Sequence, residues 1–85
     1  MPEISRFLGI VIQMYYSDHA RPHFHARYSR YRIKVDIELG VVKGEFPPQP
    51  LRAVLDWYVA HKDELRDNWN RARDGRPLVD IAPLE

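Results

Sequence analysis

Residues 18–38 read DHARPHFHARYSRYRIKVDIE, and they carry the alternation that two β-strands require. Successive side chains of a strand point to opposite faces of a sheet. In residues 23–28, two histidines and an arginine therefore share one face, and Phe, Ala and Tyr share the other. Residues 31–38 alternate between apolar and charged side chains in the same way. The segment predicts two antiparallel strands, each with an apolar face and a polar face.

The apolar pattern also predicts the register of these two strands. A two-residue loop at Ser29-Arg30 places every apolar residue opposite another apolar residue, although this dipeptide is unusual in a tight hairpin. A slip by one residue would move the apolar side chains of one strand to the polar face. The predicted pairs are Phe24 with Val35, Ala26 with Ile33, Tyr28 with Tyr31, His23 with Asp36, His25 with Lys34 and Arg27 with Arg32.

The remaining chain predicts a further strand on each side of the hairpin, followed by a helix. Residues 10–16 are β-branched and aromatic, and residues 41–46 follow a turn-forming glycine, so the strands span about 10–46. Apolar residues recur at helical spacing over about 50–74, behind a proline-rich entry and before Gly75. One straight helix of this length would overhang the strands, so the pattern also allows a bend near 61–63. Residues 76–85 are expected to form an extended tail that packs back on the core.

The predicted fold is α+β: an antiparallel three- to four-stranded meander packed on one long C-terminal helix, in two layers. We expect a single domain over residues 1–85, because this length supports one core. The other face of the sheet is expected to stay uncovered and to expose its histidines, cations, Gln13 and Tyr15. The predicted core consists of Phe24, Tyr28, Ile33, Val35, Leu51, Val54, Leu55, Tyr58 and Trp69.

Composition excludes several classes of protein and favours an anionic partner. The chain has no cysteine, which excludes a disulfide framework and thiol chemistry. It has no apolar run of membrane-spanning length and no signal peptide at its start, so we expect a cytoplasmic protein with no membrane partner. Residues 1–34 hold six arginines and lysines against two carboxylates, whereas the rest hold seven against ten.

The histidines suggest a metal site. His23 and His25 would lie about 7 Å apart on one side of a strand, close enough to share a divalent metal. His19 could supply a third nitrogen, and Asp18 or Asp36 an oxygen. The neighbouring arginines and lysine oppose a bound cation. A second reading of the same histidines is structural, as residues that cap turns and make cross-strand hydrogen bonds.

The same face also fits an anion or RNA. The candidate anion- or partner-binding residues are Arg21, Arg27, Arg32 and Lys34. Metal-independent RNA cleavage would use His23, His25 and Tyr15 as candidate catalytic residues. One neutral histidine would activate the 2′-hydroxyl, a second histidine or the tyrosine would protonate the leaving oxygen, and arginine would stabilise the charge.

The chain resembles a family of small uncharacterised bacterial proteins, grouped as a domain of unknown function, with an Asp-His-X-X-Pro-His-Phe-His signature. The resemblance rests on Phe7-X-Gly9-Ile10-X-Ile12, Met14-Tyr15-X-X-Asp18-His19-X-X-Pro22-His23-Phe24-His25-Ala26-X-Tyr28, Leu51-Arg52-X-Val54-Leu55-X-Trp57, His61 and Leu65-X-X-Asn68-Trp69. Its members resemble components of toxin–antitoxin-like gene pairs, which implies a small protein partner and activity directed at RNA. Three hypotheses follow: a binding component of such a pair, a metal-independent ribonuclease, and a metal-binding protein.

Overall fold

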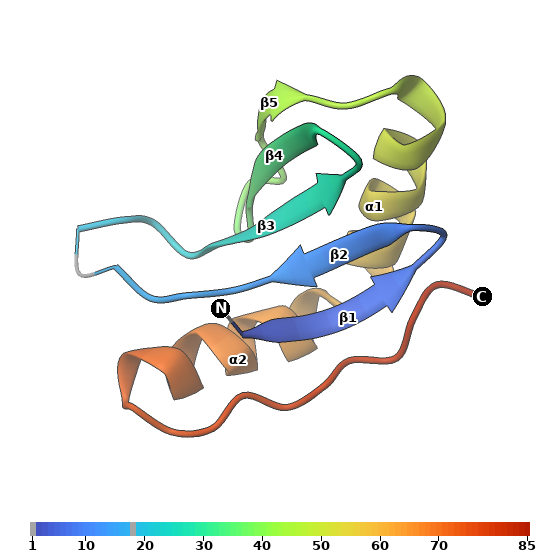
Figure 1. The fold of residues 1–85 in the computed structure, drawn as a ribbon. Coiled ribbons are helices and arrows are strands. Elements are labelled where there is room, and N and C mark those ends of the chain that lie inside the picture. The colour runs from blue at the N-terminus through green and yellow to red at the C-terminus, as the bar shows by residue number, and fades with distance from the viewer. Residues whose placement is uncertain (1, 18) are drawn as a thin grey trace.

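The computed structural model describes residues 2–17 and 19–85 and contains one five-stranded antiparallel sheet with two helices (Figure 1). The strands follow one another across the sheet in chain order, as a meander. The α+β class and the meander are therefore confirmed. The elements are β1 (Glu3–Phe7), β2 (Ile10–Gln13), β3 (His23–Tyr28), β4 (Tyr31–Asp36), β5 (Val42–Glu45), α1 (Pro48–Ala60) and α2 (Lys62–Arg73).

The predicted hairpin forms with the predicted register. All six cross-strand pairs between β3 and β4 are those expected from the apolar pattern, and Ser29 and Arg30 form the turn. Ser29 adopts a φ of 54°, which is the left-handed backbone that a tight hairpin turn requires. Burial of Phe24 and Val35 on the inner face outweighs the cost of this unfavourable turn residue.

The prediction of three to four strands is wrong, because β1 forms a fifth strand at the edge of the sheet. The alternation in β1 is broken by a bulge between Glu3 and Ser5, so its sequence does not show a period of two. The turn into β2 uses Leu8 and Gly9, with φ values of 52° and 77°. Leucine rarely adopts this backbone, so the primed turn has no recognisable sequence signal.

The prediction of one long helix is wrong, because the helix is interrupted at His61, within the 61–63 segment where the sequence allowed a bend. The His61 backbone has φ −122° and ψ 23°, which lies outside the helical region, and α2 starts at the next residue. In Figure 1, α1 lies behind the sheet whereas α2 runs in another direction beneath it. The change of direction allows Trp57 on α1 and Trp69 on α2 both to be buried.

The C-terminal tail packs back on the protein and is held by specific hydrogen bonds. Helix α2 ends at the predicted glycine, where the Arg76 N–H donates to the Arg71 carbonyl at 2.8 Å. Buried Asn68 then forms two hydrogen bonds with the backbone of Val79, both at 2.8 Å. Further along, the Ile81 N–H donates to the Ile4 carbonyl of β1 at 2.8 Å. The tail therefore covers the outer edge of β1.

The core lies between the inner face of the sheet and the helices. Phe24 contacts Trp57 with ring centroids 5.7 Å apart, and both side chains are fully buried. Six of the nine predicted core residues are buried, and the other three, Tyr28, Leu51 and Leu55, are half-buried. Neither helix in the described part of the chain has the length and apolar character needed to cross a membrane.

Candidate functional site

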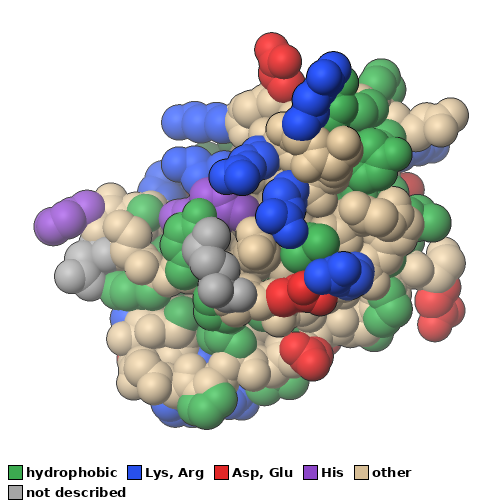
Figure 2. Space-filling view, viewed as in Figure 1, with side chains coloured by type: hydrophobic (Ala, Val, Ile, Leu, Met, Phe, Trp, Pro, Cys, Tyr) green, Lys and Arg blue, Asp and Glu red, His purple; other side chains and the backbone are tan. Residues whose placement is uncertain are grey.

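The polar face of β3, β4 and β5 brings cations from three strands into adjacent rows. Strand register places Arg27 of β3 directly opposite Arg32 of β4. Lys34 of β4 lies opposite Lys43 of β5. We call Arg27, Arg32, Lys34 and Lys43 the basic face. Figure 2 shows Lys and Arg side chains (blue) gathered beside histidine side chains (purple) on the face turned to the viewer.

None of these four cations forms an ion pair or a side-chain hydrogen bond with another residue that the structure describes. Elsewhere the arginines are mostly neutralised, as in the Arg6–Glu3 pair at 2.7 Å and the Arg71–Asp67 pair at 2.8 Å. Like charges directly opposite each other on neighbouring strands repel, at a cost of roughly 0.2–1 kcal/mol a pair. The basic face therefore holds four cations without a direct ion pair, while the strand register places Glu45 of β5 across from Arg32.

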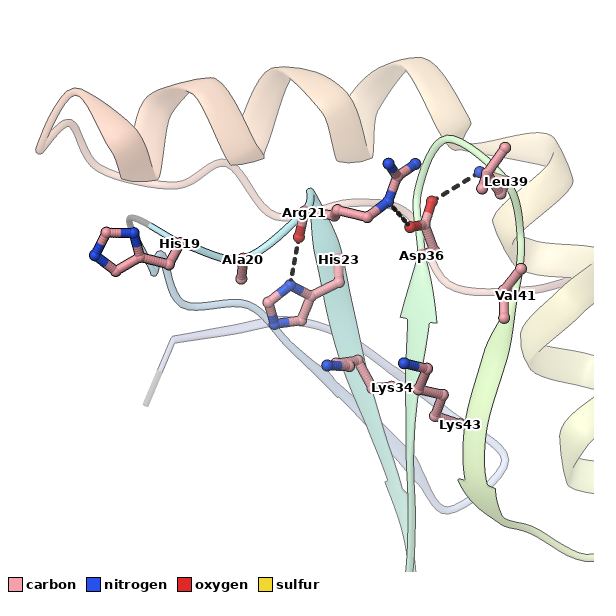
Figure 3. Close-up of a pocket in the computed structure, with 9 residues that line it drawn as sticks. All are labelled: His19, Ala20, Arg21, His23, Lys34, Asp36, Leu39, Val41 and Lys43. Carbon is pink, nitrogen blue, oxygen red and sulfur yellow. Dashed lines mark hydrogen bonds and ion pairs between the residues drawn. The ribbon is translucent and has the colours of Figure 1, made fainter.

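A hollow of about 400 Å³ lies at one end of the basic face. In Figure 3, Lys34 and Lys43 lie side by side on adjacent strands, with both ammonium groups directed toward His23. The exposed apolar side chains Leu39 and Val41 form the rim on the β5 side. The hollow is lined by His19, Ala20, Arg21, His23, Lys34, Asp36, Leu39, Val41 and Lys43. Its cationic floor and apolar rim suit an acidic ligand that also carries apolar groups.

Asp36 organises the wall of this hollow. Its carboxylate accepts a hydrogen bond from Arg21 Nε at 2.7 Å and another from the Leu39 N–H at 2.8 Å. The Arg21 guanidinium, together with the backbone donors, holds the pKa of Asp36 below its usual value. The two bonds fix the loop before β3 and the β4–β5 turn against each other. The predicted anion-binding residue Arg21 therefore already holds one carboxylate, that of Asp36.

His23 is buried, so the expectation that it is exposed on an open face is wrong. Its side chain is 7% accessible, because the Trp69 ring of α2 lies beside it with centroids 5.2 Å apart. Its Nδ1 lies 2.7 Å from the Arg21 carbonyl, so the neutral ring donates from Nδ1 and leaves Nε2 without a proton. The sequence did not show this contact, since Trp69 comes from a helix whose direction depends on the break at His61.

His25 is half-buried between two rings. Tyr15 stacks on it with centroids 4.6 Å apart and planes at 8°, and His23 meets it edge-on at 5.0 Å. Burial lowers the pKa of His25 below its usual value of 6.5, and the nearby positive charge of Lys34 lowers it further. Its Nε2 is enclosed and has no hydrogen-bond partner among the described residues. Near neutral pH, His25 is therefore an uncharged base that is shielded from solvent.

The predicted metal ligands are only partly brought together. His23 and His25 are adjacent, whereas the His19 ring points away from His23 in Figure 3. Asp18 lies outside the described residues. Within residues 2–17 and 19–85, no three side chains of metal-ligating type gather around one point. A divalent metal held by the histidines stays a prediction.

Sequence reasoning did not select Lys43, Leu39 or Val41. The structure brings the predicted Arg27, Arg32 and Lys34 together on one face, and Lys43 extends this face by one strand. Lys43 could have been found by continuing the hairpin register through the turn at Gly40, which places it opposite Lys34. The rim residues lie in an irregular turn, where no periodicity indicates which way a side chain points.

A sequence model described as Domain of unknown function (DUF4160) matches residues 9–70. This region includes β2 to β5, α1 and most of α2, and so it contains the basic face and the hollow. No curated protein and no solved structure shows significant similarity to the chain.

Proposed function

Because the chain belongs to the DUF4160 family, whose description assigns no activity, we propose a function from the site: the basic face binds a small acidic partner protein. In this proposal the chain is the binding component of a toxin–antitoxin-like pair in the cytoplasm. The paired-gene resemblance of the sequence supports a protein partner of small size. The positive charge of the basic face supports an acidic partner.

The unpaired cations of the basic face carry this proposal. Arg27 opposes Arg32, and Lys34 opposes Lys43, with no described carboxylate bonded to any of them. Carboxylates of a partner would relieve both repulsions at once. Opposite potentials on two surfaces accelerate their encounter and favour the correct partner over others.

The rim of the hollow favours a protein over RNA as the partner. Leu39 is 68% exposed and Val41 is 50% exposed, and both line the hollow beside Lys43. Protein interfaces bury apolar side chains inside a polar rim, whereas binding of an RNA backbone depends mainly on phosphate contacts. An acidic protein segment with apolar side chains would use both kinds of group in the hollow.

The ribonuclease alternative needs a histidine nitrogen that reaches a 2′-hydroxyl. His25 is the uncharged base that such chemistry requires, but its Nε2 is enclosed. The Nδ1 of His23 already donates to the Arg21 carbonyl. Use of His25 as the base would therefore require the Tyr15–His25 stack to open first.

The test first identifies a short gene beside the one that encodes this chain, and then measures binding of its product by calorimetry at several salt concentrations. We expect the double variant Lys34→Glu, Lys43→Glu to bind at least about tenfold more weakly than the unchanged protein. Arg52→Glu changes an exposed cation on α1, away from the face, and is expected to bind normally. Equal binding by all three proteins, or no binding by the unchanged protein, would refute the proposal.

A parallel incubation with single-stranded RNA and with zinc separates the alternatives. RNA cleavage that is lost in His25→Gln would establish the ribonuclease instead of the binding component. A rise in melting temperature with zinc that chelator reverses would establish a metal site. We expect neither effect.

A further inference from the structure

The two edges of the sheet differ, and this difference points to a mode of partner binding. The β1 edge is covered by the tail through the Ile81–Ile4 hydrogen bond. The other edge is β5, which pairs only with β4 among the strands of the described chain. An uncovered edge presents backbone N–H and C=O groups to which another strand can bond.

The backbone groups that β5 offers can be identified. The Asp36 N–H donates to the Val41 carbonyl at 2.9 Å, so Val41 directs its carbonyl toward β4. Orientation alternates along an antiparallel strand. Val42 therefore directs its N–H and C=O groups away from β4, whereas the positive φ of Gly44 (111°) interrupts the regular alternation.

A hollow lies beside β5 on each face of the sheet. On the polar face is the cationic hollow with Lys34 and Lys43. On the inner face, a second hollow of about 580 Å³ is lined mainly by apolar side chains, among them Val42, Phe46 and Leu51. Successive side chains of an added strand would enter these two hollows in turn.

We propose that β5 accepts an extended segment of the acidic partner as a sixth strand. Its carboxylates contact Lys34 and Lys43, and its apolar side chains enter the hollow beside Val42 and Phe46. The ligand is thus a segment in which acidic and apolar residues alternate, a form of strand addition to a sheet edge. This inference rests on the proposed function, and it specifies how the partner docks.

Charge argues against a second copy of the chain as the occupant. Two β5 strands paired edge to edge with Lys43 opposite Lys43 would bring the lysines of both copies together, and only a register that sets Lys43 opposite Glu45 would compensate them. A lysine on an edge strand commonly prevents such self-association. The same lysine attracts an acidic strand, so it selects the partner and excludes the copy.

The test uses a synthetic peptide of alternating Glu and Val, with hydrogen exchange read at individual backbone amides. We expect the peptide to protect the Val42 amide. It should bind about tenfold more tightly than a peptide of the same composition with Glu and Val in two separate blocks. Only the alternating peptide places acidic side chains in one hollow and apolar side chains in the other.

Two controls separate the edge from the face. A peptide with N-methyl groups on alternate amides keeps every side chain but loses strand hydrogen bonds, and we expect it to lose binding. The Lys43→Glu variant should bind the Glu/Val peptide more weakly and should bind a Lys/Val peptide instead.

The outcomes distinguish this inference from the proposed function. Equal binding of the N-methylated peptide would overturn strand addition while leaving an acidic ligand on the basic face. Failure of both the peptide and the partner protein to bind would overturn the two proposals together. Concentration-dependent dimerisation without peptide, lost in a Val42→Pro variant, would identify a second copy as the occupant and refute the inference.

Discussion

Replacing Asn68 by alanine should release the C-terminal tail and destabilise the whole protein. The Asn68 side chain is 1% exposed, and it forms two hydrogen bonds with Val79, one as donor and one as acceptor. Neutral hydrogen bonds of this kind contribute about 1 kcal/mol each, and a small cavity adds to the loss. We expect Asn68→Ala to lower the free energy of unfolding by about 2–3 kcal/mol.

This loss is a large fraction of the total free energy of unfolding. An 85-residue domain has a stability of about 4–13 kcal/mol, so the melting temperature should fall by about 8–20 °C. Urea unfolding gives the free energy, and hydrogen exchange at the Ile81 amide reports whether the tail still covers β1. Asn70→Ala is the matched control on the same helix, because the Asn70 side chain forms no hydrogen bond with another described residue. A change below about 0.5 kcal/mol in Asn68→Ala, with Ile81 still protected, would refute this account of the tail.

Three further predictions concern the hollow and its histidines. His23→Ala should cost about 2–4 kcal/mol in urea unfolding, because the buried ring packs on Trp69 and bonds the Arg21 carbonyl; an unchanged midpoint would contradict this contact. His25 has a folded-state pKa below 6.5, so the unfolded chain binds the proton more readily, and stability should fall as the pH drops below about 6.5. His25→Gln should remove this part of the pH dependence, and an unchanged slope would exclude His25 as its source. Asp36 has a lowered pKa in the folded protein, so its pair with Arg21 stabilises the fold above about pH 3.9, and this stabilisation is lost at lower pH. Asp36→Asn should therefore reduce the fall in stability at acidic pH. An unchanged fall would mean that other carboxylates cause it.

The hairpin could be predicted from the sequence because its register depends only on the pattern of apolar side chains in two neighbouring strands. Alternation in β3 and β4 fixes which side chains face the core, and only one register matches Phe24 to Val35 and Ala26 to Ile33. The basic face follows from the same register. Its members on β3 and β4 were therefore available from sequence, although what they bind was not.

The missed features depend on contacts between distant parts of the chain. The apolar stripe continues across His61, so periodicity cannot show that the helix direction changes there. That change brings Trp69 onto His23, which converts a histidine expected to be exposed into a buried one. Likewise, the sequence pattern does not distinguish Asn68 from an ordinary polar residue, because its hydrogen-bond partner Val79 lies in the C-terminal tail.

The tail bonded to β1 also makes the two edges of the sheet unequal for any association through strand pairing. A sheet with two open edges can add strands at both sides and grow without limit, as fibrils do. In this protein the chain's own tail occupies one edge through the Ile81 amide, which leaves a single growth point at β5. The strand addition proposed above is therefore restricted to the β5 side, because a second chain could pair with β1 only by displacing the tail.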